Sequence, residues 1–172
     1  MKEGMRAANR VELHRMTPAE QQHYRLEAIG LLADEQTRAF GTAPAEARSQ
    51  AERAFDVLQQ QGDDARRQHV FTLRFEAVSI GWLWFEIRGS GENSIAYLKD
   101  IHLHPPWRGR RLGLKAMESF EDDALRAGCR SIVLNVFAHN SVAIGFYRKQ
   151  HYVVASHILR KDIQDADPDH IA

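Results

Sequence analysis

The chain has 172 residues, of which 44% are hydrophobic, and its 23 Lys and Arg residues balance its 23 Asp and Glu residues. This length suits one domain with a full core and is short for two. Because there is no net positive field, we expect no nucleic-acid or membrane partner, and any phosphate group has to be bound by a local cluster of cations. No stretch reaches the roughly 18 apolar residues of a membrane span.

The chain has a single cysteine, Cys129. One cysteine excludes an internal disulfide and a multi-cysteine zinc site, and it suits a reducing compartment, so we expect an unexported, cytoplasmic protein. Cys129 comes just before an apolar segment and is interpreted as buried packing rather than as a nucleophile.

The first third of the chain is expected to be mainly helical. Residues 1–9 are expected to form a loose leader, and the alternation over residues 11–15 predicts a short strand. Thr17-Pro18-Ala19-Glu20 supplies an N-cap, a proline at the first helical position and a capping-box glutamate, which predicts a helix start. A second helix is expected after Gly41, ending at about Gln61. The inner face of the first helix is expected to hold Tyr24, Ala28, Leu31 and Leu32.

From residue 69 the pattern changes to runs of β-branched and aromatic residues joined by short turns, and strands then alternate with helices. The tail at 161–172 is too polar to order itself. The sequence therefore predicts one mixed α/β domain over residues 1–172, with helices on the faces of a sheet. The expected elements are strands at 70–74, 78–87 and 94–104, a helix to about 127, a strand at 130–137, a short helix at 140–149 and a last strand at 152–159.

Residues 105–115 place two glycines and four cations where a strand passes into a helix. Backbone N–H groups beside Gly109 and Gly113 can converge on an anion there, because no side chain stands in the way and a helix N-terminus carries about +0.5 charge. The segment is therefore interpreted as a phosphate cradle. Its four cations are Arg108, Arg110, Arg111 and Lys115.

Two common nucleotide motifs do not fit this turn. A P-loop needs four residues between its first glycine and a Gly-Lys-Ser/Thr ending, whereas three residues separate Gly109 from Gly113, and Ala116 follows Lys115. A dinucleotide fingerprint is excluded as well, because the chain has no G-x-G-x-x-G run opening a βαβ unit.

The turn, with the strand before it and the helix after it, resembles motif A of the Gcn5-related N-acetyltransferases (GNAT), whose pattern is Gln/Arg-x-x-Gly-x-Gly/Ala. Arg108, Leu112 and Gly113 stand in register with that pattern. Two positions depart from the family. Arg111 occupies the slot of the middle glycine, so that either this position has ordinary helical dihedrals or the turn is distorted. His151, followed by Tyr152, replaces the glycine of a later Gly-Phe pair.

A second resemblance lies downstream of the first. Residues 134–147 are similar to motif B of the same family, with its Asn-x-x-Ala-x-x-x-Tyr core, and the two motifs together span about residues 94–157. Residues 81–84, Gly-Trp-Leu-Trp, together with residues 134–140, are similar to a poorly characterised bacterial subgroup.

The resemblance implies a single-domain acetyltransferase fold with an N-terminal helix pair and splayed parallel strands. It implies transfer of an acetyl group from acetyl-CoA to a primary amine of a small molecule or peptide, by direct attack and without an acyl-enzyme. A homodimer is common in the family, although the sequence identifies no interface. The alternative is a non-catalytic acyl-CoA-binding regulatory module with the same fold, which the substitution at Arg111 motivates.

The resemblance implies that the amides of the turn hold the pyrophosphate and that the Arg111 guanidinium can reach a 3′-phosphate. It also implies that the pantetheine arm pairs with backbone groups where the strand at 101–103 splays from the one at 135–137. Without the cofactor, the backbone N–H and C=O groups of the splayed strands would stay unpaired. The expected cofactor-binding residues are Ile101, His102, Leu103, Arg108, Gly109, Arg110, Arg111, Leu112, Gly113, Leu114, Asn135, Asn140, Ala143 and Tyr147.

Tyr147, placed by motif B, is the expected general acid, because a phenol can protonate a leaving thiolate. Asp100 is the expected general base, with Glu86 and His102 as reserves, and a backbone N–H near Leu103 is the expected oxyanion donor. The i, i+2 spacing of His102 and His104 suggests a metal site, but no third ligand lies nearby in the sequence, so no metal is expected.

Overall fold

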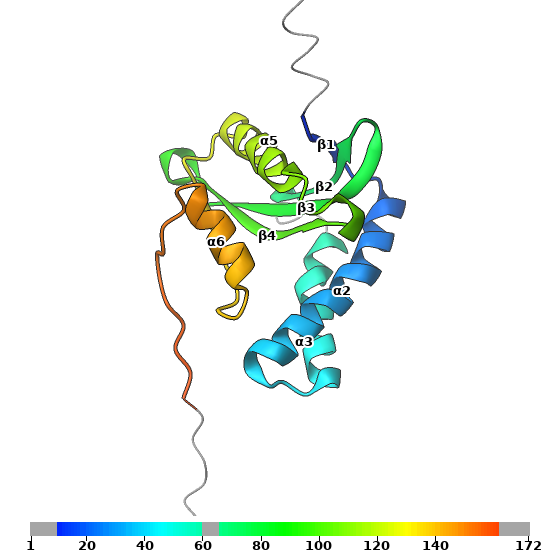
Figure 1. Ribbon diagram of the computed structural model, residues 1–172, viewed down its shortest axis with the longest axis vertical. Coiled ribbons are helices and arrows are strands. Elements are labelled where there is room, and N and C mark those ends of the chain that lie inside the picture. The colour runs from blue at the N-terminus through cyan, green and yellow to red at the C-terminus, as the bar shows by residue number, and fades with distance from the viewer. Residues whose placement is uncertain (1–9, 60–65, 162–172) are drawn as a thin grey trace, which may run out of the picture. The chain divides into compact units, whose positions relative to one another are not determined.

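The computed structural model describes residues 10–59 and 66–161. The chain separates into two compact units, Met1–Phe137 and Ala138–Ala172, and each is described by itself (Figure 1). The expected leader at 1–9, the end of the second helix at Gln61 and the tail from 162 lie outside the described residues.

A five-stranded sheet in the order β1-β2-β3-β4-β5 forms the centre of the first unit. The first four strands pair antiparallel with their neighbours, whereas β5 pairs parallel with β4. The strands are β1 (Glu12–Arg15), β2 (Gln68–Phe75), β3 (Val78–Arg88), β4 (Ile95–Leu103) and β5 (Ser131–Leu134). The expected meander of three strands is therefore confirmed as β2, β3 and β4.

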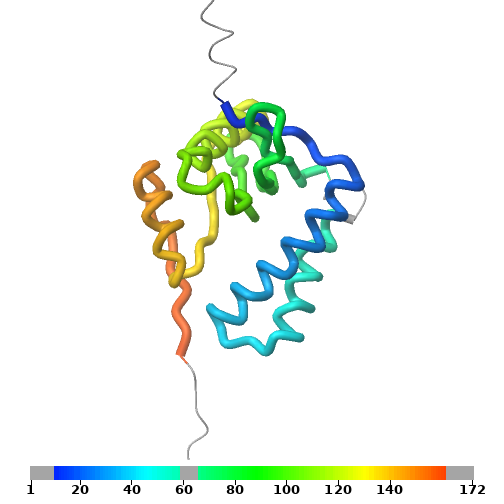
Figure 2. Tube along the Cα trace, turned by 45° about the vertical axis from the view of Figure 1, so that its right-hand side comes forward, coloured from blue at the N-terminus to red at the C-terminus, as the bar shows by residue number. Residues whose placement is uncertain are grey.

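Two antiparallel helices, α2 (Pro18–Phe40) and α3 (Pro44–Asp56), cover one face of this sheet (Figures 1 and 2). The start of α2 is the expected one, because Thr17 and Glu20 form a complete capping box. The core beneath the two helices is built from aromatic, alanine and aliphatic side chains, namely Tyr24, Ala28, Ile29, Ala33, Ala47, Ala51, Phe55, Val70, Trp82 and Trp84.

The helix α5 (Leu112–Arg126) covers the opposite face, as Figure 1 shows. The Phe120 ring packs against Phe85 of β3 with ring centroids 5.0 Å apart. The buried Ser119 hydroxyl donates a 2.6 Å hydrogen bond to the carbonyl of Val11, which fastens the start of the sheet to α5. None of the helices in residues 10–59 and 66–161 is long and apolar enough to span a membrane.

The parallel ladder between β4 and β5 ends early. Its last pair is Leu98 with Leu134, yet β4 continues to Leu103 without a parallel partner among the described residues. A register shift in the β3–β4 ladder also falls here, since Trp84 pairs with Asp100 and Phe85 with Leu98. The end of β4 therefore has one open edge, and the expected splaying of the parallel strands is confirmed.

The second unit contains the helix α6 (Ser141–Lys149), which confirms the expected short helix. Asn140 is its N-cap, and its Oδ1 accepts a 3.0 Å hydrogen bond from the backbone N–H of Ala143. The chain from residue 152 to 161 has no regular secondary structure.

Three expectations about the fold were wrong. Leu31 is 41% exposed, because the buried stripe of α2 turns toward Ile29 and Ala33 and leaves Leu31 at its edge. The strand expected at 130–137 ends at Leu134. The strand expected at 152–159 does not form, because a strand needs backbone partners and no described strand pairs with this segment.

Candidate active site

The glycine turn begins where β4 ends and leads into α5. A single turn of 3-10 helix spans Pro105–Trp107, and Gly109 follows with a φ of 73°. Arg111 is the N-cap of α5, with φ 59° and ψ 12°. Arg111 thus adopts the left-handed conformation that suits glycine, rather than the helical dihedrals expected of an ordinary residue, at a cost of about 1–2 kcal/mol.

The cations of the turn have defined contacts. The Arg108 Nε–H donates a 2.8 Å hydrogen bond to the Leu103 carbonyl, and its Nη2 lies 3.2 Å from Nε2 of His102. The Arg110 guanidinium lies 5.3 Å from the ring centroid of Trp107. Arg108 therefore links the turn to the open end of β4.

The open edge of β4 presents backbone groups of Leu103. The N–H of His104 donates to the Ile80 carbonyl of β3 at 2.9 Å. Because successive residues of a strand alternate sides, the N–H of Leu103 points away from β3, toward the edge that β5 no longer covers. The carbonyl that accepts from Arg108 belongs to the same residue and lies on the same side.

Asp100 lies under α2 with its carboxylate held by aromatic donors. Its Oδ2 accepts hydrogen bonds from Trp82 Nε1 at 2.7 Å and from the Tyr24 hydroxyl at 3.0 Å. Burial raises the pKa of Asp100 from 3.8 to about 6, against the opposing effect of these bonds and one from the Ile101 N–H. Burial and the nearby Asp100 carboxylate raise the pKa of Tyr24 well above its ordinary value of 10.

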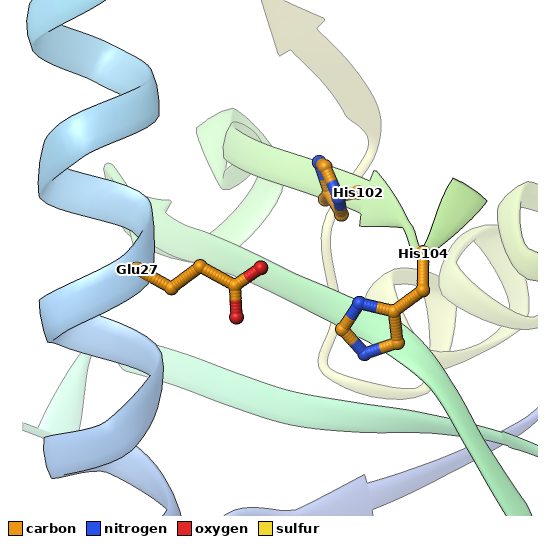
Figure 3. Close-up of side chains that lie close together, drawn as sticks. All are labelled: Glu27, His102 and His104. Atoms are coloured by element: carbon orange, nitrogen blue, oxygen red, sulfur yellow. The ribbon is translucent and has the colours of Figure 1, made fainter.

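The Glu27 side chain meets two imidazoles that lie far from it in the sequence. Figure 3 shows the Glu27 side chain reaching from α2 toward the imidazoles of His102 and His104, and one ligand atom from each lies within 4.8 Å of the others. The His102 ring stacks on the Trp82 indole with centroids 4.4 Å apart and planes 10° apart. Burial, Arg108 and His104 lower the pKa of His102 to about 4, with Glu27 opposing.

A cavity of about 470 Å³ opens between α2 and the sheet next to this cluster. Glu27 and His104 line it, and so do Tyr24 and Trp82, the two donors to Asp100. Its other lining residues are Met16, Ala19, Glu20, His23, Thr72, Ser79 and Gly81.

The reasoning from sequence missed Glu27 and Tyr24. Tyr24 was expected in the core, and no sequence feature of Glu27 predicted that it would meet the end of β4, 75 residues later. One signal was available, because residues three apart on a helix share a face, and Glu27 follows Tyr24 by three. The helical register alone could not show that this face of α2 meets the end of β4.

The reserve base Glu86 is engaged elsewhere on the sheet. Its carboxylate forms a 2.9 Å ion pair with Arg88 and lies 3.9 Å from the Lys99 ammonium. Asn135 follows β5 as an exposed residue outside the strand. Neither residue is among those that line the cavity next to Glu27 and His104.

Tyr147, Asn140 and Ala143 belong to the second unit. The Tyr147 ring packs edge-on against Phe146 and Tyr152, with centroids 5.4 Å away in both cases. The Tyr147 carbonyl accepts from the Tyr152 N–H at 3.1 Å. His151 has a φ of 66°, so it also keeps a left-handed conformation where the family has glycine.

The parallel strand pair opens before the glycine turn and the N-terminus of α5, as the resemblance led us to expect. The family model of the acetyltransferase (GNAT) family matches residues 29–152, and the chain belongs to this family. This confirms the expected fold class, the enzyme class of an N-acetyltransferase and acetyl-CoA as acetyl donor.

Two curated relatives come from Bacillus subtilis strain 168. The uncharacterised N-acetyltransferase YycN is 26% identical over 132 residues, which are 76% of this chain and 85% of YycN. The uncharacterised N-acetyltransferase YdgE is 24% identical over 152 residues, which are 88% of this chain and 97% of YdgE.

Solved structures share the fold. The crystal structure of YycN superposes with a TM-score of 0.82 at 24% identity, covering 90% of this chain and 99% of that one. The aminoglycoside N-acetyltransferase AAC(6′)-Iy, in complex with a bisubstrate analogue, superposes with a TM-score of 0.56 at 15% identity, covering 90% and 99%.

Proposed function

We propose that this chain transfers the acetyl group of acetyl-CoA directly to a primary amine of a small molecule or peptide. The observation that carries the proposal is the open edge of β4 after Leu98, followed by the left-handed turn at Gly109 and Arg111. An open edge offers backbone groups to the peptide-like pantetheine arm, and the turn offers amides at a helix N-terminus to its pyrophosphate.

The cofactor is held by residues of β4 and of the turn. Ile101 to Leu103 pair with the pantetheine arm, and the amides of residues 109–114 take the pyrophosphate, with the arginines of the turn as charge partners. The Leu103 N–H, which points to the open edge, donates to the developing oxyanion, a contribution of about 3 kcal/mol for one well-placed donor. Asn135, Asn140 and Ala143 complete the cofactor site in this proposal.

Asp100 is the proposed general base. Its pKa of about 6 makes it a stronger base than His102, whose pKa is about 4, and unlike Glu86 it forms no ion pair within the described residues. The proton passes through Tyr24, because Tyr24 lines the cavity and its hydroxyl donates to Asp100. As the amine gives a proton to the Tyr24 oxygen, the hydroxyl gives its own proton to Asp100.

The neutral amine then attacks the thioester carbonyl and forms the new C–N bond. The nitrogen of the tetrahedral intermediate loses its extra proton to water, the intermediate collapses with cleavage of the C–S bond, and the CoA thiolate leaves. Tyr147 protonates this thiolate in the proposal, because a phenol with a pKa near 10 can supply a proton to a thiolate whose acid has a pKa near 8.5.

The function is tested by release of free CoA thiol from acetyl-CoA in the presence of a panel of primary amines and peptides. Amine-dependent release, with an acetylated amine found by mass spectrometry, is the expected result. Binding of acetyl-CoA without release on any amine would favour the regulatory module. The cytoplasmic location stays a prediction from the cysteine content, which localisation in intact cells can check.

A further inference from the structure

We infer that Glu27, His102 and His104 bind the ammonium group of the acceptor, and that the adjoining cavity selects amines with one positive charge and an apolar body. The inference rests on the proposed function, which it deepens by naming the acceptor class. Glu27 lies on α2, while His102 and His104 lie at the end of β4, so the site joins two elements of the first unit (Figure 3).

The spacing of the three groups suits an ammonium ion. An ammonium nitrogen that donates three charge-assisted hydrogen bonds of about 2.8 Å in tetrahedral directions places its acceptors about 4.6 Å apart. The ligand atoms of the cluster lie within 4.8 Å of one another. Exchange of one of these three hydrogen bonds for a bond to the Tyr24 oxygen then starts the proton transfer proposed above.

An imidazole can accept a hydrogen bond from the ammonium group when its ring is neutral. A neutral imidazole offers one unprotonated nitrogen, and the lowered pKa of His102 keeps its ring neutral near pH 7. Stacking on Trp82 fixes the orientation of that ring. Arg108 Nη2 lies 3.2 Å from Nε2 of His102. Once Arg108 turns to the cofactor phosphates, as proposed above, Nε2 is available to accept from the ammonium.

The charges around the cavity leave one carboxylate without a cation to balance it among the described residues. The Glu20 carboxylate accepts from the Thr17 N–H at 2.8 Å and lies 3.8 Å from the Arg74 guanidinium. The Glu27 carboxylate has no ion pair or hydrogen bond within residues 10–59 and 66–161. Glu27 is therefore the unbalanced negative group of the cavity, and it lies at the end where the imidazoles are.

The rest of the lining favours an apolar substrate body. Met16, Tyr24 and Trp82 give the cavity aliphatic and aromatic walls. A second ammonium in the substrate would have to lose its hydration against these walls, because Arg74 already neutralises Glu20. A single ammonium can be held by Glu27 while its chain covers the aromatic faces.

The test compares pentylamine with 1,5-diaminopentane, two acceptors of equal chain length that differ in one charge. We expect kcat/KM for pentylamine to exceed that for the diamine at least tenfold in CoA release. Glu27→Gln is expected to lower kcat/KM for pentylamine at least tenfold and to leave the KM for acetyl-CoA unchanged. Glu46→Gln, an exposed position in the first turn of α3, is the matched control and is expected to change neither value.

Preference for the diamine, or full activity of Glu27→Gln, would overturn the inference and leave the proposed function intact. If the wild-type protein acetylates no amine, calorimetric titration of pentylamine into the CoA complex decides the inference alone: binding that Glu27→Gln abolishes supports it, and no binding overturns it. One equivalent of Zn²⁺ retained through dialysis by the wild type and lost from Glu27→Gln would assign the cluster to a metal and overturn the inference.

Discussion

The indole N–H of Trp82 donates a 2.7 Å hydrogen bond to Oδ2 of Asp100, across two neighbouring strands of the sheet. The same Trp82 ring stacks on His102, so one side chain orients both the proposed base and one ammonium ligand. Trp82 is itself 4% exposed and packed in the core beneath α2 and α3. The geometry of the site is therefore set by core packing.

The stability of the protein should depend on the titration of Asp100. Its folded-state pKa, about 6, lies above its ordinary value of 3.8, so the folded protein holds this proton more tightly than the unfolded chain does. The contribution favours folding below pH 4 and is lost as the pH rises from about 4 to about 6, with a size of about 3 kcal/mol. Urea unfolding of the wild type and of Asp100→Asn across this range measures it.

The Asn variant should lack this contribution, because its amide does not ionise and its oxygen can still accept from Trp82 and Tyr24. The free energy of unfolding of the wild type should then fall relative to Asp100→Asn between pH 4 and pH 6. A constant difference between the two proteins over that range would show that the carboxylate stays ionised in the fold.

Asp100 should also set the acidic limb of activity. If its carboxylate takes the acceptor proton through Tyr24, kcat/KM of the wild type should rise with a pKa near 6, and Asp100→Asn should remove that limb and lower the plateau by about 10²- to 10⁴-fold. The measurement is a pH profile of kcat/KM, with the amine varied at saturating acetyl-CoA. An unaltered limb in the variant would assign the base to another group.

Tyr147→Phe should lower kcat by about 10²-fold or more, since it removes the proposed proton donor to the CoA thiolate. The affinity for acetyl-CoA should stay nearly unchanged, because the ring and its packing against Phe146 and Tyr152 are kept. Tyr152→Phe, which removes the neighbouring hydroxyl, is the matched control. Full activity of Tyr147→Phe would remove the assignment.

Local signals in the sequence predicted local structure well. The capping box of Thr17 with Glu20 and the N-cap at Asn140 both form as expected, because each depends on residues three apart. The meeting of Glu27 with His104 could not be predicted, since it depends on how α2 crosses the sheet. The strand expected at 152–159 does not form for a similar reason, because alternation along a segment does not show which strand will pair with it.

Arg111→Gly should stabilise the protein. At φ 59° an arginine carries left-handed strain that glycine does not, and relief of the strain exceeds the entropy that glycine adds to the unfolded chain, so we expect a gain of about 0.5–1 kcal/mol. Arg110→Gly, at a neighbouring residue of negative φ, should instead destabilise. Thermal unfolding of both variants, read by circular dichroism, separates the two effects.

Arg111→Gly also tests the role of the Arg111 side chain. If its guanidinium reaches the 3′-phosphate of CoA, Arg111→Gly should bind CoA more weakly while binding dephospho-CoA, which lacks that phosphate, as the wild type does. Equal losses for both ligands would show that the substitution acts on the turn itself.

Gly81→Ala should damage both the fold and the site. A Cβ at this position of β3 would lie 1.9 Å from the carbonyl oxygen of His102, so the two strands would have to separate where the ammonium ligands are placed. We expect a loss of more than about 2 kcal/mol in the free energy of unfolding, because the clash is with backbone that cannot rotate away. Gly30→Ala is the matched control, since Gly30 lies within α2 with nothing within 4 Å of its Cβ position, and it should gain about 0.5–1 kcal/mol. Equal stability of Gly81→Ala and wild type in urea unfolding would contradict the close approach of β3 and β4 at His102.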